Sequence, residues 1–403
     1  QLKNRVIMGS MHTGLEDRLW NYDKLAAYFA ERAKGGVGLI VTGGFAPNLE
    51  GELAPLSSNL THSLVLPWHR KVTNAVHKEG GKIAMQILHA GRYAYQPLAV
   101  SASAVKSPIS PFKPRALSSK GVQKQIDAYG RCAKLARKAG YDGVEVMGSE
   151  GYFINQFLCK RTNKRTDEWG GSLENRARLL LESIRAVRKA VGDKFPVALK
   201  LNSADFQKGG FSHEESVQVA SWLNDEGLDL LEVSGGTYEQ MSFVNGTDET
   251  EQRDSTRRRE AYFLEYAREV RKAVKAPIMV TGGFRSADAM EQALGEDGIE
   301  MIGLARPLCI DPDAAGKLID GTKRQIGIDE AGLMLGTGSL GANTRNWFVN
   351  LMNTVSSVEY YAWQMTRMSR GEPPQTIHRN STVGTFLWYL TATTYKGLRC
   401  KFR

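Results

Sequence analysis

The sequence has few cysteines and no long apolar stretch, and each absence excludes a class of protein. Its four cysteines, among 403 residues, form no CxxC pair, so they indicate neither a zinc site nor an iron–sulfur cluster. They predict reduced thiols and a cytoplasmic location. No run of about 18 apolar residues occurs, which argues against an integral membrane segment. The sequence starts at Gln1 without an initiator Met, so a removed targeting segment would lie outside it.

The composition is that of a globular protein with a sizeable core. Hydrophobic residues make up 42% and charged residues 24%, and the length predicts two domains at most. The net charge of +10 favours anionic partners, but the basic residues are scattered along expected helix faces. This pattern fits a phosphate-bearing ligand at least as well as nucleic acid. We therefore expect a small-molecule substrate and no nucleic-acid partner.

Eight short apolar runs alternate with segments of helical periodicity. The runs are 5–10, 37–44, 82–88, 143–148, 196–202, 228–236, 277–284 and 299–307. Strand and helix repeated in this way imply parallel strands joined by helical crossovers, with both faces of each strand buried. The pattern predicts a (β/α)8 TIM barrel. The alternative, a doubly wound sheet, would normally carry a GxGxxG turn after its first strand, and GSMHTG (9–14) does not fit that spacing.

The pattern changes after the eighth run. Residues 345–374 carry apolar side chains at helical spacing and end at Gly371 and a Pro pair, which predicts a docked helix. The aromatic and basic stretch 380–403 contains no acidic residue. It predicts a helix packed on the barrel wall or on a neighbouring subunit, the alternative being a membrane surface. We expect a barrel over 1–325 and a mostly helical extension over 326–403, through which the chain forms a homo-oligomer.

Polar side chains and glycines gather where the expected strands end, which is where TIM barrels carry their chemistry. Gly282 and Gly283 follow the seventh strand, and Arg306 follows the eighth. Backbone N–H groups and a guanidinium in these places favour a phosphate site. Gln86 and Lys200 end otherwise apolar strands, so they need polar partners: a ligand, a salt bridge or each other.

Several ordered segments carry a resemblance to a known family. They are KNRVIMGSM (3–11), QILHAGR (86–92), GYDGVEVMGSEGYFINQFL (140–158), TNKRTDEWGGSLENRARLLLESIRAVR (162–188), EVSGGTYEQ (232–240), VTGGFRS (280–286) and GLARPL (303–308). Together they resemble the Old Yellow Enzyme family of FMN-dependent ene-reductases and NADH:flavin oxidoreductases. The motifs MGSEGY (147–152) and GSMHTG (9–14) are most similar to the barrel domain of bacterial 2,4-dienoyl-CoA reductase.

The resemblance implies FMN across the carboxyl end of the barrel, with NADH or NADPH as the hydride donor. It places Ser10, Met11 and His12 beside the flavin ring and has Gly44 leave room for it. It has Gln86 and Lys200 hydrogen-bond the pyrimidine end, where a cation stabilises the charge of reduced flavin; the family commonly has Arg in place of Lys200. It assigns the phosphate to Gly282, Gly283, Arg285, Ala305 and Arg306.

The substrate side departs from the family pattern. The usual pair of substrate-binding side chains after strand four is replaced by Met147 and Glu150, whereas Tyr152 keeps the position of the proton donor. The dienoyl-CoA reductases share this Met and Glu and add a His from the strand-six loop. Tyr238 aligns with that His, so the second activating residue is Tyr238 or is absent.

Two further features of that branch bear on the mechanism. Arg161 matches an Arg of the branch, and it either holds Tyr152, binds an anionic substrate or is a solvated loop residue. The cluster-binding cysteines after the barrel are missing, so electrons are expected to pass directly from nicotinamide to FMN.

Three functions follow. The first is an FMN-dependent reductase of activated alkenes, with Tyr152 as the acid and Tyr238, Glu150 and Arg161 as further active-site residues. The second is a dihydrouridine synthase-like RNA enzyme, which would need a catalytic Cys near the flavin, with Cys159 and Cys309 as the candidates. The third is a flavin-binding protein with little catalytic power.

Overall fold

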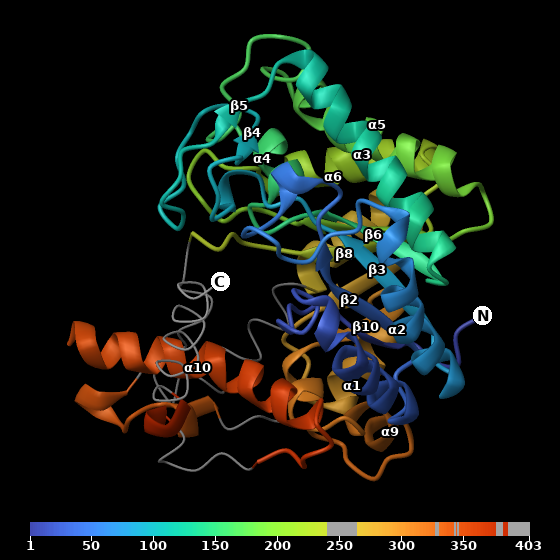
Figure 1. The fold of residues 1–403 in the computed structure, drawn as a ribbon, viewed down its shortest axis with the longest axis vertical. Helices are drawn as coiled ribbons and strands as arrows, with labels where there is room; N and C mark the ends of the chain where they lie inside the picture. Colours follow the sequence, from blue (N-terminus) through green and yellow to red (C-terminus); the bar gives the residue numbers. More distant parts are fainter. Residues whose placement is uncertain (240–263, 327–329, 342–343, 345, 376–381, 386–403) are drawn as a thin grey trace.

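The computed structural model describes residues 1–239, 264–326, 330–341, 344, 346–375 and 382–385. Eight parallel strands close into a barrel in the order β1-β10-β9-β8-β7-β6-β3-β2, as predicted (Figure 1). The strands are β1 (Val6–Met8), β2 (Leu39–Phe45), β3 (Ile83–Ile87), β6 (Gly143–Gly148), β7 (Val197–Asn202), β8 (Leu230–Ser234), β9 (Ile278–Thr281) and β10 (Met301–Leu304). A small two-stranded sheet of β4 (Val100–Ser101) and β5 (Arg115–Ala116), which the apolar runs did not indicate, lies outside the barrel.

Helices surround the barrel and connect its strands (Figure 1). They are α1 (Tyr22–Lys34), α2 (Leu66–Lys78), α3 (Ser119–Lys138), α4 (Phe153–Leu158), α5 (Leu173–Val191), α6 (His213–Trp222), α8 (Ala287–Gly295), α9 (Ala314–Ile319) and α10 (Trp347–Met368). The segment between β8 and β9 is helical from 264 to 273, and residues 240–263 lie outside the described residues. Serines cap four helices, because a Ser hydroxyl accepts from a backbone N–H that the first turn leaves without a partner. They are Ser118, Ser172, Ser212 and Ser286.

The barrel interior changes from apolar to charged along its axis. Ile7, Val41, Leu230 and Met279 pack together with Ala198 at one level. Side chains alternate across a strand, so the residues two positions further along β7 and β8 face the same interior, and these are Lys200 and Glu232. The register also sets Glu145 of β6 beside Gln86 of β3. The charged layer therefore lies next to the carboxyl end of the strands.

The C-terminal helix α10 is where the apolar spacing predicted it, and it lies beside the barrel (Figure 1). Its last residue, Met368, packs against Arg32 of α1, whose fully buried guanidinium also donates to the Leu308 carbonyl over 3.1 Å. Burying a guanidinium is costly without such partners, so Arg32 specifies how this end of α10 docks. The predicted helix in 380–403 lies outside the described residues except for 382–385.

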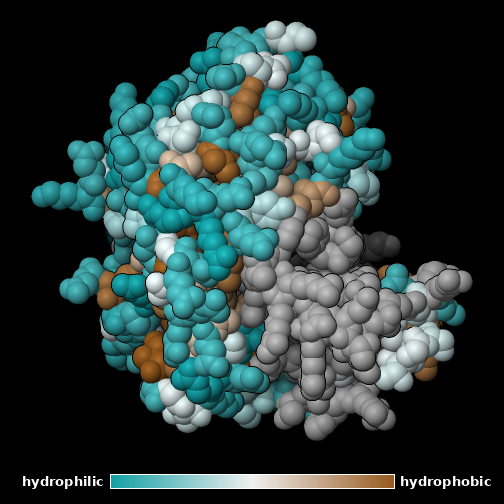
Figure 2. Space-filling model, turned by 180° about the vertical axis from the view of Figure 1, so that it is seen from behind, coloured by the Kyte–Doolittle hydropathy of each residue, from teal (hydrophilic) through white to brown (hydrophobic). Residues whose placement is uncertain are grey.

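The outer surface carries no sign of a membrane span in the part of the chain that the structure describes: none of its helices is both long and apolar enough to cross a bilayer. In Figure 2, hydrophilic residues cover most of the described surface on that face, with apolar side chains scattered among them.

Candidate active site

Lys200 is the centre of a buried ionic cluster at the carboxyl end of the barrel. Its ammonium lies 2.8 Å from Glu150 and 3.4 Å from Glu232, and its side chain is only 8% exposed. Burial lowers the pKa of Lys200, but the carboxylates of Glu150, Glu232 and Glu145 outweigh this and raise it above its ordinary value. The lysine is therefore charged. The sequence predicted a ligand, a salt bridge or Gln86 as the partner of Lys200, and the structure contains a salt bridge.

Glu145 and Glu232 form a carboxyl pair that shares the interior with Lys200. Both side chains are fully buried, and the Gln86 amide donates to Glu145 over 2.8 Å. Ionising two neighbouring buried carboxyl groups is costly, and both oxygens of Glu232 and one oxygen of Glu145 have no hydrogen-bond donor among the described residues. Burial and then the charge of Glu232 raise the pKa of Glu145 well above its ordinary value. Glu145 therefore holds a proton.

Glu150 occupies a strained backbone conformation that places its carboxylate on Lys200. Its φ is +60°, in the left-handed region that a non-glycine residue enters at a cost of about 1–2 kcal/mol. The side chain of Asn202 holds it there by accepting from the Glu150 N–H over 3.1 Å. Strain of this kind persists where the surroundings fix the residue, as at many active sites. The sequence predicted Glu150 in the active site but did not predict its ion pair with Lys200.

Tyr152 and Tyr238 lie beside this cluster as a contacting pair. Their rings meet edge to face with centroids 5.7 Å apart. The Tyr238 backbone N–H donates to the Glu150 carbonyl over 3.4 Å. Burial and the Glu150 charge raise the pKa of Tyr152, while the Glu150 charge is the main cause that raises the pKa of Tyr238. A series of contacts thus runs from Lys200 through Glu150 and Tyr238 to Tyr152.

Tyr93 covers the other side of Tyr152, an arrangement that the sequence did not indicate. The two rings are 5.6 Å apart, edge to face. Gly151 makes this approach possible, because its φ of +84° suits glycine and a Cβ there would overlap the Tyr93 hydroxyl. Three phenols therefore gather at the end of β6.

The segment after β1 lies at the same end of the barrel. The His12 imidazole contacts Glu16 at 3.3 Å and Asp17 at 3.1 Å. Burial lowers the pKa of His12, but the two carboxylates raise it well above its ordinary value, so His12 carries a positive charge at neutral pH. The Met11 sulfur packs 3.3 Å from the Cys309 sulfur, and Ser10 is partly exposed.

The expected phosphate residues come together at the ends of β9 and β10. Gly282 and Gly283 have φ of +98° and +87°, and a Cβ at Gly282 would meet only open space. Arg306 is exposed directly after Ala305, and the Arg285 side chain turns back to donate to the Phe284 carbonyl over 2.9 Å. Open space beside turn glycines and a nearby guanidinium fits a phosphate group.

The surroundings of Gly44 differ from the prediction, whereas Arg161 lies at a pocket. The space beside Gly44, expected to leave room for the ring, is filled by Leu88, whose side chain a Cβ at residue 44 would overlap. Glycine is needed there because Leu88 packs close to β2. The Arg161 guanidinium donates to the Lys208 carbonyl over 3.1 Å, and it lines a pocket together with Gly151.

The acidic residues that surround Lys200 inside the barrel were not predicted from the sequence. Glu145 and Glu232 sit in the apolar runs GVEVMG and LDLLEVSGG, where a single glutamate was available as a signal of a buried ionic group.

Residues 1–325 match the NADH:flavin oxidoreductase / NADH oxidase family. The chain belongs to this family. Membership confirms the predicted fold and family, and it indicates the flavin FMN and NAD(P)H as the cofactors.

Relatives and solved structures of this family agree with the match. The chain is 34% identical over 337 residues to a metal reductase of Desulforamulus reducens, which covers 81% of the chain and 48% of that protein. It is 31% identical to the structure of a 2-naphthoyl-CoA reductase complex, with a TM-score of 0.71 over 79% of the chain and 50% of that protein. It is 25% identical to morphinone reductase in complex with tetrahydroNAD, with a TM-score of 0.64 over 80% of the chain and 88% of that protein. The chain thus spans about half the length of the first two proteins.

The family match gives no support to the RNA-modifying alternative. The cysteines considered for it are buried, and burial raises the pKa of Cys159 to about 11 and that of Cys309 to about 12. Neither thiol is therefore activated as a nucleophile.

The carboxyl pair predicts an unusual pH dependence of stability. In the unfolded chain Glu145 loses its proton near pH 4.5, whereas the folded chain keeps it, so wild-type stability falls as pH rises by up to about 1.4 kcal/mol per pH unit. Glu145→Gln replaces the protonated carboxyl with an uncharged amide, so it removes this loss of stability with rising pH. Thermal denaturation should therefore show the variant gaining stability over the wild type from about pH 5 to pH 8.

The exposed Glu296 provides the control, since Glu296→Gln should give a difference that does not change with pH. A pH-independent difference for Glu145→Gln would mean that Glu145 is ionised in the folded chain.

Proposed function

We propose that the chain is an FMN-dependent NAD(P)H oxidoreductase that reduces an activated alkene, with Tyr152 as the proton donor. The observation that carries the proposal is the contacting pair Tyr152–Tyr238 beside the Lys200 cluster. Bound FMN would accept hydride from the nicotinamide and pass it to one carbon of the alkene. The chain must then protonate the other carbon, and the phenol pair is suited to that step.

The surroundings of Tyr152 keep its phenol protonated, as a general acid requires. The Glu150 charge and burial keep its phenol protonated at neutral pH. Tyr238 contacts the Tyr152 ring at a centroid distance of 5.7 Å, and its backbone N–H donates to the Glu150 carbonyl over 3.4 Å. Once Tyr152 has given up its proton, the Tyr238 O–H can turn to the new phenolate and stabilise it. Tyr238 thus serves as the second activating residue in place of the expected His.

The described residues also suit the cofactor. Lys200 and Gln86 would hold the pyrimidine end of the flavin, where the ammonium offsets negative charge. Gly282, Gly283 and Arg306 would hold the phosphate. Ser10, Met11 and His12 would line the ring from the segment after β1, with His12 adding a second positive charge.

The domain bounds, the oligomer, the class of substrate and the location of the protein are part of the same proposal. The barrel is one domain over 1–325, and the extension 326–403 joins copies of the chain into a homo-oligomer. The substrate is a small molecule and not a nucleic acid. The protein works in the cytoplasm, which the three buried free cysteines Cys132, Cys159 and Cys309 suit. The weakly catalytic alternative differs only in turnover, so steady-state alkene reduction decides between them.

The phosphate assignment predicts the effect of Arg306→Ala. Loss of the guanidinium removes a charge-assisted contact with the phosphate, so the Kd for FMN should rise about 10-fold or more. Titration of the stripped protein with FMN measures it. Arg324→Ala is the matched control, because Arg324 is exposed and pairs with Asp288 and Glu291. Equal affinities in wild type, Arg306→Ala and Arg324→Ala would show that Arg306 is not a phosphate ligand.

If Tyr152 is the acid, replacing it should slow only one of the two half-reactions. Tyr152→Phe should leave reduction of the flavin by NAD(P)H nearly unchanged and slow alkene reduction by about 100-fold, the size of a general-acid contribution. Tyr238→Phe should slow alkene reduction less, because it removes only the stabilisation of the phenolate. Anaerobic stopped-flow measurements separate the steps. If alkene reduction is as fast in Tyr152→Phe as in the wild type, another group or water delivers the proton.

A further inference from the structure

A pocket opens beside the phenol pair and is lined largely by polar residues. It has a volume of about 230 Å³ and is lined by Arg92, Lys106 and Arg161 together with Gly151, Thr237 and Glu239. Gly151 directly precedes Tyr152, and Thr237 and Glu239 flank Tyr238. The pocket is therefore adjacent in the chain to both members of the pair that we propose for protonation.

Arg92 brings a buried and incompletely satisfied guanidinium to this pocket. Its side chain is 5% exposed and pairs with Glu239. Its Nε–H, however, has no acceptor among the residues that the structure describes. A buried donor without an acceptor is unfavourable, and an acceptor oxygen of a ligand would relieve the cost. The pocket thus contains a hydrogen-bond donor, the Arg92 Nε–H, that has no acceptor among the described residues.

The positive charges exceed the negative charges, and the acids are already engaged. Asp205 also lines the pocket, but its carboxylate accepts from Asn155, Asn202 and the Phe211 N–H over 2.9–3.0 Å. Glu239 is occupied by Arg92 and by the Ser107 hydroxyl. Lys106 and Arg161 are exposed at the pocket, one on each side. Three cations against two engaged carboxylates favour an anionic ligand.

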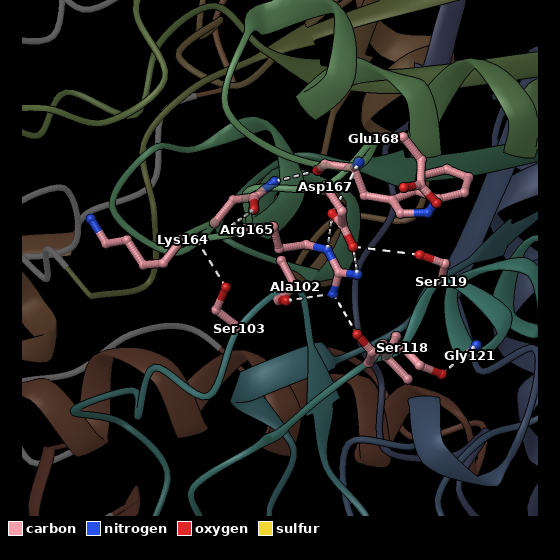
Figure 3. A network of polar contacts seen from close by, with 12 residues as sticks. Ala102, Ser103, Ser118, Ser119, Gly121, Lys164, Arg165, Asp167 and Glu168 are labelled. Atoms are coloured by element: carbon pink, nitrogen blue, oxygen red, sulfur yellow. Dashed lines mark hydrogen bonds and ion pairs between the residues drawn. The ribbon is translucent and has the colours of Figure 1, made fainter.

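Arg165 fixes the two walls that carry these cations (Figure 3). It donates to the Ala102 carbonyl over 3.0 Å and to the Leu117 carbonyl, both on the segment that includes Lys106. It also pairs with Asp167, on the segment that includes Arg161. The neighbouring Lys164 N–H donates to the Ser103 hydroxyl over 2.9 Å. The spacing between the two walls is therefore set by hydrogen bonds and not left to the loops.

We propose that this pocket binds an anionic group of the alkene substrate, a carboxylate or a phosphate, and so selects activated alkenes that carry one. The inference rests on the proposed function, since it names the class of substrate for that site. Arg161 and Lys106 attract the anion, and the Arg92 Nε–H hydrogen-bonds it. Anchoring the anion here holds the alkene beside Tyr152.

The test compares an anionic alkene with its uncharged ester: 4-oxopent-2-enoate and its methyl ester. Both carry the same activating ketone, and because the ester also activates the alkene, the measured quantity is the change in their ratio between wild type and variant. The wild type should prefer the acid, and Arg161→Gln should lower the ratio of kcat/KM for acid over ester by about 10-fold, mainly through the KM of the acid. Lys208→Gln is the matched control, because Lys208 is exposed nearby without lining the pocket, and it should leave the ratio unchanged.

A binding measurement keeps the inference separate from turnover. Calorimetric titration of the FMN-loaded enzyme with the saturated analogue 4-oxopentanoate should give a Kd about 10-fold weaker in Arg161→Gln. If this loss is seen but neither alkene is reduced by the wild type, the anion site stands and the proposed function falls. An unchanged ratio and an unchanged Kd would overturn the anion site. A raised KM for NADPH relative to NADH, with an unchanged ratio, would also overturn it, because the anion would then belong to the hydride donor.

Discussion

The positive charge of Lys200 inside the barrel is the constraint on which the carboxyl end of this protein depends. An ammonium removed from water needs carboxylates around it, and Glu232 and Glu150 supply them from two different segments of the barrel end. Glu232 in turn lies against Glu145, which must then keep its proton and is held by Gln86. On the other side, Glu150 adopts a left-handed backbone conformation to reach the ammonium and orients Tyr238. Both the flavin-facing and the substrate-facing groups are thus tied to one lysine.

The choice of lysine fits this arrangement. An arginine, common at this position in the family, presents its donors in a rigid planar fork, whereas an ammonium is a compact point charge with three rotatable donors. Lys200 can therefore serve carboxylates on two sides while keeping capacity for a ligand. The glutamate at position 150, where most of the family has a hydrogen-bonding residue for the substrate, belongs to the same adaptation. Its carboxylate is turned to the lysine and the phenols.

How much of this could be predicted from the sequence depends on how local each feature is. The eight strands follow from apolar runs and the helix starts from serines such as Ser172, because burial and capping are decided within a few residues. The resemblance also placed Tyr152 and Tyr238 in one site. The partners of Lys200 could not be predicted, since they depend on the register that sets Glu232 beside it and Gln86 beside Glu145. Gly44 shows the same limit: the sequence marks a close approach, but only the packing shows that Leu88 makes it.

The close approach of Tyr93 to Gly151 links the evolution of two distant positions. Any side chain at residue 151 would occupy the place of the Tyr93 hydroxyl, so the wall of the pocket and the loop that carries Tyr152 cannot vary separately. A homologue that recruits a different substrate by reshaping this wall would have to replace Tyr93 before, or together with, the glycine. Selection for new specificity would therefore act on residues 93 and 151 in that order or together, because a side chain introduced at residue 151 alone would overlap the Tyr93 hydroxyl.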